Sequence, residues 1–371
     1  LNNLAALSQQ RGDNKKAEEL YLQAIELVED KTSSSYAEVL ENLAVLYSNT
    51  GKLEEANKLM EESMGLIATL YGEEHERMAS SLRKRALIER ELHNYEKSEE
   101  YYKKAITISN GIDPSSMLSM QSTNGLAVLY KELGKYSESD DLFQQTILNA
   151  KKLSNNSSFY ALVLNNQAAL KQIKGEHFQA RNLLQESLGV SESSGSTSSS
   201  AYLGTLENLS AMYIELGEYE NARSILTKSK NIILEKFGNT SPSYAANVLN
   251  FGRLEQAMGR YPDAEPYFKE AVELSRKNFG EEHPEYARSL NAMALFYQLL
   301  GNTGEAEPLL LESASIYEST YGKSHPEYIT TIENLSSLYQ IKGEVDRALP
   351  LLQEALKMDA IVYGEEHPVY A

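Results

Sequence analysis

Acidic side chains surround a histidine in one short segment of the chain. Glu281, Glu282, His283 and Glu285 fall within five residues. Carboxylates beside an imidazole are typical ligands of a divalent metal ion, and the same groups can act as a general acid and base. The segment is therefore a candidate metal site or catalytic site, unless its place in the chain gives it a structural role.

The same motif returns along the chain. Similar segments begin at Tyr71, Tyr321 and Tyr363. The last three histidines of the motif stand 42 residues apart, at His283, His325 and His367. A catalytic site is normally built once, whereas a feature with a fixed period of roughly 20 to 50 residues indicates a repeat protein. The period of the chain therefore has to be established before any residue is assigned a reaction.

The composition excludes several classes of function. The chain has 371 residues with neither Cys nor Trp, so it has no disulfide, no thiolate nucleophile and no Cys-based zinc site. Its 35 basic and 53 acidic residues give a formal net charge of −18, which argues against nucleic acid or an anionic membrane as the main partner. No stretch approaches about 18 consecutive apolar residues, the length that a membrane-spanning helix needs.

The two ends of the chain do not indicate the cellular compartment of the protein. The first residue is Leu1 rather than Met, and it falls inside a repeat. Both termini look cut, so a signal peptide would not be visible. The absence of Cys does not fix the compartment either, and by default we expect a cytoplasmic protein.

A period of 41 or 42 residues covers the chain when Tyr36 is taken as position 1 of a repeat. We predict that residues 1–371 form a single solenoid of such repeats. The predicted repeats are residues 1–35, which lack the first four positions, 36–77, 78–118, 119–159, 160–201, 202–243, 244–285, 286–327 and 328–369, with 370–371 opening a further repeat.

Residue size is fixed at several positions of the repeat. Position 25 is always large and apolar, as in Tyr102 and Phe268, and positions 9 and 21 are small in all nine copies, as in Ala264. Positions 21 and 28 are seven apart, so they share one helix face, with position 25 between them. Small residues let two helices approach closely, and the large residue fills the adjoining gap.

Glycine at position 16 divides each repeat into two helices. It is present in eight of nine copies, with His93 as the exception. Glycine ends a helix because it accepts the left-handed conformation without penalty. A second helix then runs from position 18 to about position 32. Each repeat is predicted to be a helix–turn–helix hairpin, which cannot bury its apolar face alone.

This architecture gives the histidine motif a structural explanation. We expect Gly280 to end a second helix and Pro284 to open the next first helix, where a missing N–H costs nothing. Glu285 then faces the positive end of that helix, and His283 is extended because it precedes a proline. Each such loop supplies one His and no Cys. We therefore predict no metal, no cofactor and no catalytic residue in this chain.

The pattern YAxxLNNLAxLYxxxGxxxEAExLxxxAL resembles the tetratricopeptide repeat in the 42-residue form of kinesin light chains. The resemblance covers essentially the whole chain and implies an all-α fold, a right-handed α-solenoid (superhelix) of antiparallel helix-turn-helix repeats. Departures concentrate in the third and fourth repeats, where Arg85 replaces Leu, His93 replaces Gly and Gly125 replaces Asn. Packing and groove shape are hardest to predict there.

The resemblance also implies a ligand-binding face. In the family, the first helices line the concave face, and Asn at position 7 resembles a ladder that holds an extended peptide. The candidates at position 7 are Asn3, Asn42, Asn166, Asn208, Asn250 and Asn334, and position 13 adds Gln9, Gln172, Gln256, Gln298 and Gln340. An amide offers a donor and an acceptor and can pair with any peptide backbone. The same Asn side chains could instead hydrogen-bond within the scaffold.

A basic cluster lies in the third repeat of this acidic chain. Arg83, Lys84 and Arg90, with Arg85 between them, could grip a carboxylate of a partner. They could equally form a solvated face that pairs with Glu89, Glu91 and their neighbours. The sequence leaves both interpretations open.

These observations favour a binding scaffold whose concave groove holds a peptide segment or a protein partner, with no nucleic acid and no membrane insertion. The alternative is a sensor region of a larger bacterial effector, since the resemblance extends to arrays beside caspase-like peptidase or nucleotide-switch domains. An enzyme within these residues is the third possibility. The chain carries no glycine-rich phosphate loop, no HExxH motif and no nucleophile elbow.

Overall fold

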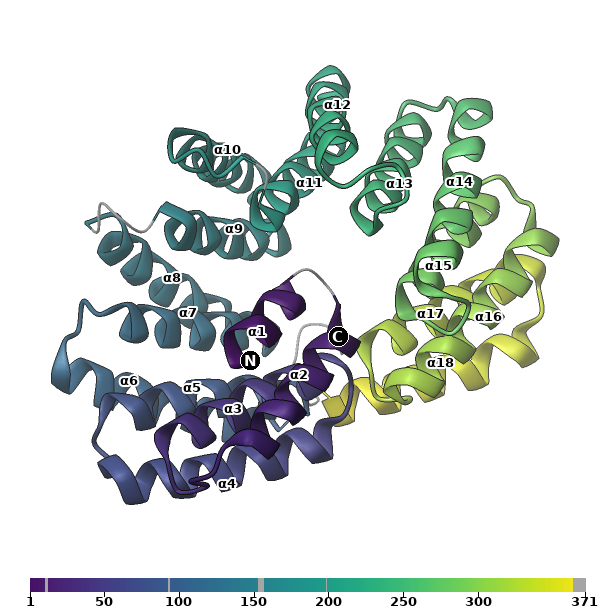
Figure 1. The fold of residues 1–371 in the computed structure, drawn as a ribbon. Coiled ribbons are helices and arrows are strands. Elements are labelled where there is room, and N and C mark those ends of the chain that lie inside the picture. Colours follow the sequence, from purple (N-terminus) through teal and green to yellow (C-terminus); the bar gives the residue numbers. More distant parts are fainter. Residues whose placement is uncertain (11–12, 93, 153–156, 198, 363–371) are drawn as a thin grey trace. The chain divides into compact units, whose positions relative to one another are not determined.

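The computed structural model describes residues 1–10, 13–92, 94–152, 157–197 and 199–362. These residues form 18 α-helices and no β-strand, an all-α solenoid of paired helices (Figure 1). The chain divides into two compact units, Leu1–Ser154 and Asn155–Ala371. A single solenoid over the whole chain stays a prediction.

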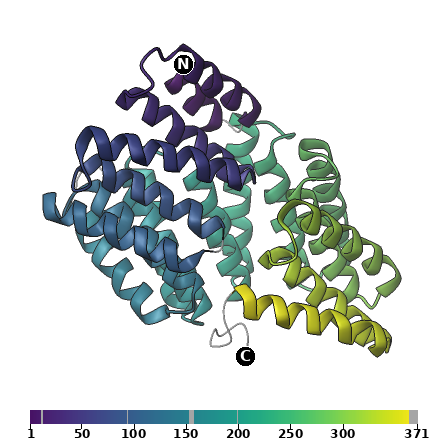
Figure 2. The ribbon, with the colours of Figure 1, turned by 90° about the horizontal axis from the view of Figure 1, so that it is seen from below.

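The first unit contains four hairpins. Its helices are α1 (Asn2–Gln10), α2 (Asn14–Leu27), α3 (Ser34–Asn49), α4 (Leu53–Tyr71), α5 (Glu76–Glu91), α6 (Tyr95–Ile112), α7 (Met117–Glu132) and α8 (Tyr136–Ala150). Odd-numbered helices are the first helices of their repeats and even-numbered helices the second. Within the unit the helices stack in chain order (Figure 2), and consecutive first helices contact one another.

The second unit contains five hairpins. Its helices are α9 (Ser157–Ile173), α10 (His177–Ser193), α11 (Ser200–Glu215), α12 (Tyr219–Lys236), α13 (Pro242–Ala257), α14 (Tyr261–Phe279), α15 (Pro284–Leu299), α16 (Thr303–Tyr321), α17 (Pro326–Lys342) and α18 (Val345–Val362). Every described repeat therefore has the two helices that its sequence predicts.

The turn inside each hairpin is the predicted one. All seven described glycines at position 16 have a positive φ, between 69° and 80°, as in Gly134 and Gly301. Second helices such as α14 and α16 run beyond position 32 and continue for 19 residues until Gly280 and Gly322, which have a positive φ, and the end at Gly280 is the expected one. The glycine of the loop, rather than position 32, ends these helices.

The small positions lie in close contacts between helices. Ala264 and Ala306 are fully buried, beside the large position-25 residues Phe268 and Leu310. At three of these positions serine replaces alanine, and its hydroxyl donates a hydrogen bond to a carbonyl of the facing helix. These bonds join Ser98 to Ala86 at 2.8 Å, Ser139 to Ala127 at 2.7 Å and Ser336 to Ala348 at 3.0 Å. These serines are therefore small enough for the close helix contact, and their buried hydroxyls are hydrogen-bonded.

The histidine motif is a helix start, as predicted. Gly280 ends α14, Pro284 is the first residue of α15, and His283 is extended with φ −92° and ψ 139°. The sequence did not predict that the imidazole itself caps the helix. Nδ1 of His283 accepts a hydrogen bond from the backbone N–H of Glu285 at 3.1 Å. Its ring stacks on Phe279, with 4.6 Å between ring centroids.

His75 and His325 cap α5 and α17 in the same way. His93, His367 and residues 370–371, to which the sequence analysis assigned roles, lie outside the described residues. No helix in the described part of the chain is long and apolar enough to cross a membrane.

Candidate functional site

A row of side-chain hydrogen bonds connects consecutive first helices. Each bond runs from position 7 of one repeat to position 6 of the repeat before it. The four bonds are Asn42 to Asn2 at 3.0 Å, Lys84 to Glu41 at 2.6 Å, Asn250 to Glu207 at 3.2 Å and Asn334 to Asn291 at 3.2 Å. We call this row the inter-repeat ladder. It joins neighbouring repeats, as the scaffold alternative for these amides anticipates.

The ladder leaves several of the predicted amides available. Asn3 and Asn208 are exposed, and Asn208 has no hydrogen-bond partner among the described residues. Asn166 is half-buried and already interacts with the protein. Asn42 and Asn334 donate one N–H to the ladder, and an amide has two N–H donors and a carbonyl. Membership of the ladder therefore does not prevent a second contact.

The glutamines at position 13 also make contacts within the protein. Gln172 donates to Glu215 at 2.6 Å, and Gln298 donates to Ser337 at 3.2 Å. Gln340 makes a longer contact of 3.5 Å with Ser336, and Gln256 is half-buried. Like the ladder, the first two bonds run between neighbouring repeats.

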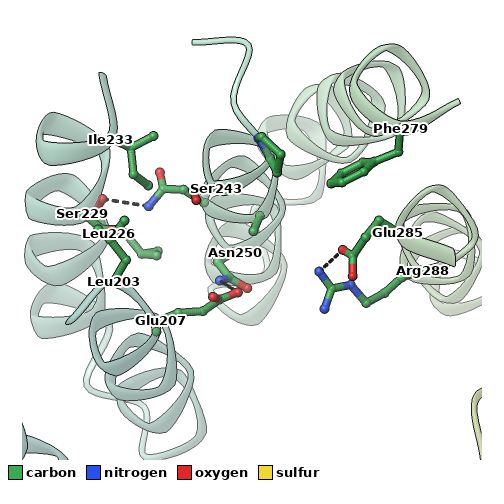
Figure 3. Close-up of a pocket in the computed structure, with 14 residues that line it drawn as sticks. Leu203, Glu207, Leu226, Ser229, Ile233, Ser243, Asn250, Phe279, Glu285 and Arg288 are labelled. Atoms are coloured by element: carbon green, nitrogen blue, oxygen red, sulfur yellow. Dashed lines mark hydrogen bonds and ion pairs between the residues drawn. The ribbon is translucent and has the colours of Figure 1, made fainter. Parts of the chain in front are cut away.

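A pocket of about 380 Å³ opens between α11, α12, α13 and the start of α15 in the second unit. Leu203, Leu226 and Ile233 form an apolar wall, and Phe279 lies on the opposite side (Figure 3). Position 3 of the two adjoining repeats is small, being Gly204 and Ala246, which keeps the pocket open.

Polar groups are distributed around this pocket. Asn250 and Glu207 point toward each other at one edge, and Arg288 pairs with Glu285 at another (Figure 3). Asn247 is only 4% exposed and donates to the carbonyl of Leu226 at 3.1 Å, while its side-chain oxygen has no partner among the described residues. The pocket therefore offers an apolar wall, a charged pair and a buried acceptor.

Of the polar residues of this pocket, only Asn250 was expected from the sequence. A signal for Asn247 exists at position 4, where the neighbouring repeats carry the smaller Thr205 and Ser289. No comparable signal marks Glu207 or Arg288, whose roles depend on the fold bringing three repeats together.

The basic cluster of the first unit divides into paired and unpaired cations. Lys84 donates to the buried carboxylate of Glu41, and Arg90 pairs with Glu91 at 2.7 Å. Arg83 makes no ion pair with any described residue, and its Nε is buried without a hydrogen-bond partner. Burial lowers the pKa of Arg83. The structure therefore distinguishes Arg83 from its neighbours, which the sequence could not do.

Arg85 belongs to the core rather than to a binding face. Its side chain is only 5% exposed and forms an ion pair of 2.9 Å with Glu89, whose side chain is 1% exposed. It also donates to the carbonyl of Asn57 at 3.0 Å. The charge that replaces leucine at this position is thus neutralised by a buried carboxylate of the same helix.

The part of the chain that the structure describes has no group of three or more His, Asp or Glu side chains that could hold a metal ion.

Several solved structures resemble the chain. The apo form of RapI is 15% identical, with a TM-score of 0.60 and 98% of each chain covered. BtubC (BKLC) from P. vanneervenii is 18% identical over 63% of this chain and 92% of its own, with a TM-score of 0.44. Repeats of a putative kinesin light chain from Podosopora anserina are 23% identical over 56% of this chain and 98% of theirs, with a TM-score of 0.42. At these identities the likeness concerns the fold alone.

No curated protein sequence matches the chain. The model of the tetratricopeptide repeat family, in contrast, matches it six times. The matches span residues 1–67, 35–111, 77–152, 159–235, 244–307 and 287–361. Because they cover nearly the whole length, the chain belongs to the tetratricopeptide repeat family, and it is a repeat scaffold of the kind that mediates protein interactions.

Proposed function

We propose that the first-helix face of each unit binds an extended peptide segment of a protein partner. The centre of this binding face is placed at Asn208 and Asn250, with Asn166 beside them. The remaining predicted contacts are Asn3, Asn42, Asn334, Gln172, Gln256, Gln298 and Gln340, together with the basic residues Arg83, Lys84 and Arg90.

One observation carries the proposal, namely the pocket beside Asn250. A binding groove needs an apolar recess with a few convergent polar groups, and this pocket has both. Asn208 is exposed one repeat earlier, so an amide without a partner stands next to the recess. Packed helices generally stand roughly 10 Å apart, and an extended peptide advances roughly 3.3 Å per residue. One amide would therefore meet about every third ligand residue.

The test begins with a pull-down by this chain, followed by mapping of the bound peptide. The double variant Asn208→Ala/Asn250→Ala should then weaken binding of that peptide about tenfold or more, because each amide contributes about 0.5–1.5 kcal/mol of net hydrogen bonding. The effect should depend little on ligand side chains, since the contacts are to the backbone. Far-ultraviolet circular dichroism should show unchanged helicity.

A matched control changes two exposed asparagines of a second helix, Asn221→Ala/Asn231→Ala, and should leave the affinity unchanged. Because Asn250 also bonds Glu207, the single variant Asn208→Ala tests the exposed amide without disturbing the ladder. Wild-type affinity in both Asn208 variants would mean that these amides are scaffold residues and that the partner binds another surface.

A further inference from the structure

The inter-repeat ladder is interrupted between α5 and α7. Position 7 of the fourth repeat is Gly125, which has no side chain to reach Arg83 at position 6 of the third repeat. At four other junctions a hydrogen bond joins the side chain at position 7 to the side chain at position 6 of the repeat before it. The gap therefore leaves a guanidinium where those four junctions carry a satisfied pair.

Tyr102 occupies the space that a side chain at Gly125 would need. A Cβ added to Gly125 would lie 2.8 Å from the hydroxyl oxygen of Tyr102 and closer still to its ring. Such distances are below van der Waals contact, so glycine is required here for as long as Tyr102 stays in place. The tyrosine hydroxyl thus stands in the gap of the ladder.

The hydroxyl of Tyr102 has no partner in this position. The side chain is 0% exposed, and its oxygen makes no hydrogen bond with any described residue. Burial raises the pKa of Tyr102 to about 12, while the positive charges of Arg90 and Arg83 act in the opposite direction. A buried hydroxyl without a partner destabilises the fold, so a group that accepts a hydrogen bond from it would be stabilised here.

Two arginines border the same gap. Arg83 and Arg90 are seven residues apart on α5 and share one face of that helix. Arg90 reaches across to Glu132 of α7, with Nε and the carboxylate oxygen 3.6 Å apart, a distance too long for a strong hydrogen bond. Arg90 keeps a side-chain exposure of 21% and Arg83 is half-buried, so both side chains can be approached from solvent.

From this arrangement we propose that the gap at Gly125 binds a phosphate monoester carried by a partner protein. Arg83 supplies an unpaired planar fork, Arg90 a second guanidinium and Tyr102 a hydroxyl donor. A carboxylate has two oxygens in one plane and would satisfy a single fork, whereas a phosphate presents three acceptor oxygens and up to two charges. The subsite rests on the proposed function, because it supposes a peptide on the first-helix face.

The experiment uses an array of 11-residue peptides with randomised flanks and a central serine, phosphoserine or glutamate. Labelled wild-type protein should bind the phosphoserine peptides about tenfold or more better than the serine peptides. Arg83→Gln should remove most of this preference, because charge-assisted bonds are among the strongest single contacts. Tyr102→Phe, which deletes only the hydroxyl, should reduce it about two- to tenfold.

Arg77→Gln is the matched control, because Arg77 lies on the same helix and its loss changes the net charge equally. It should keep the preference for phosphoserine. Arg83→Lys retains the charge but loses the planar guanidinium. If Arg83→Gln unfolds in a thermal melt, Arg83→Lys provides the test, and it should weaken the preference for phosphoserine.

The outcomes separate this inference from the proposed function. Equal binding of serine and phosphoserine peptides overturns the phosphate subsite and leaves the peptide groove standing, whereas no binding to any peptide overturns both. Glutamate peptides as strong as phosphoserine peptides would replace the phosphate by a carboxylate and overturn the inference. Loss of the preference in Arg77→Gln would do the same, because it would mean a general charge effect.

Inorganic phosphate alone, titrated calorimetrically, distinguishes the source of the group. Much weaker binding than that of the phosphoserine peptides supports a partner protein as the source. Equal affinity, lost in Arg83→Gln, would retain the phosphate chemistry of the site and identify a free phosphate as its ligand.

Discussion

Two junctions between first helices, α15 with α17 and α5 with α7, both join stacked hairpins but differ in the inter-repeat ladder. At the first, Asn334 closes the ladder onto Asn291 at 3.2 Å. At the second, Gly125 leaves Arg83 without its ladder contact. The comparison shows that one rung of the ladder can be lost while the hairpins still stack.

A second contact explains why the stacking survives. Position 12 of one repeat bonds position 22 of the repeat before it at both junctions, from Tyr339 to Glu307 at 3.1 Å and from Tyr130 to Glu99 at 2.9 Å. Register between repeats is therefore held at two places. One of them can be opened to a ligand while the other maintains the packing.

The two junctions also differ in the core. Position 8 is Leu335 in α17 and is 3% exposed, whereas in α5 it is Arg85, which pairs with Glu89. Burying an ion pair costs desolvation that its attraction barely offsets, so an apolar pair of similar volume is often as stable or more so. The third repeat is thus specialised at the expense of its local stability.

The largest expected effect comes from breaking that buried pair. Glu89→Ala should destabilise the first unit by about 3–5 kcal/mol, because Arg85 loses its buried partner and keeps only the exposed Glu61 at 3.4 Å. Hydrogen exchange of α5 peptides measures the effect locally, and the chain has no Trp to serve as a fluorescent probe.

The double variant Arg85→Leu/Glu89→Leu replaces the buried ion pair by two apolar side chains, the first of them as at Leu335, and should restore wild-type protection or exceed it. Unchanged exchange in Glu89→Ala would mean that solvent already compensates Arg85. The contrast drawn between the two cores would then be wrong.

The next effect concerns the close helix contacts that all repeats share. Ala264→Tyr should cost about 1–3 kcal/mol, because the added ring overpacks a contact without spare volume. The damage should stay within neighbouring repeats. Ala257→Tyr, at an exposed position of the adjoining helix, should leave the thermal melt unchanged. A melt of Ala264→Tyr identical to that of wild type would contradict the repeat alignment.

Much of this architecture could be predicted from the sequence because it repeats. The small positions, the glycine turns and the loop of Pro284 each occur several times, so period alone revealed them. The site was harder to predict. Tyr102 follows the rule for position 25, and only the structure shows that its hydroxyl fills the place of a missing rung. Arg83 is unpaired because Gly125, 42 residues further along the chain, has no side chain to reach it, and the repeat period does not predict such a contact.

The helix starts provide the smallest and most local contrast between the two junctions. Ser116 caps α7 and accepts the backbone N–H of Ser119, whereas His283 caps α15 through Nδ1. A serine cap does not titrate in the physiological range, but the imidazole accepts this bond only when Nδ1 carries no proton. Burial lowers the pKa of His283 from its ordinary value of 6.5, and Glu285 acts weakly in the opposite direction.

The sign of the pH effect follows from the direction of this shift. Below pH 6.5 the unfolded chain binds a proton at His283 more readily than the folded chain does, so the free energy of unfolding falls as the pH falls. The contribution of the His283 cap to the free energy of unfolding is complete above pH 6.5 and is lost as the pH falls below that value. Its size is that of a helix cap, about 0.5–2 kcal/mol.

His283→Ser gives α15 the kind of cap that α7 has, and should flatten the pH dependence of exchange in α15 between about pH 5 and 7. The start of α7 should show no such dependence in either protein, because its cap is already a serine. A wild-type α15 whose protection is constant across this window would mean that the stacked ring of Phe279, rather than the hydrogen bond at Nδ1, holds His283 in place.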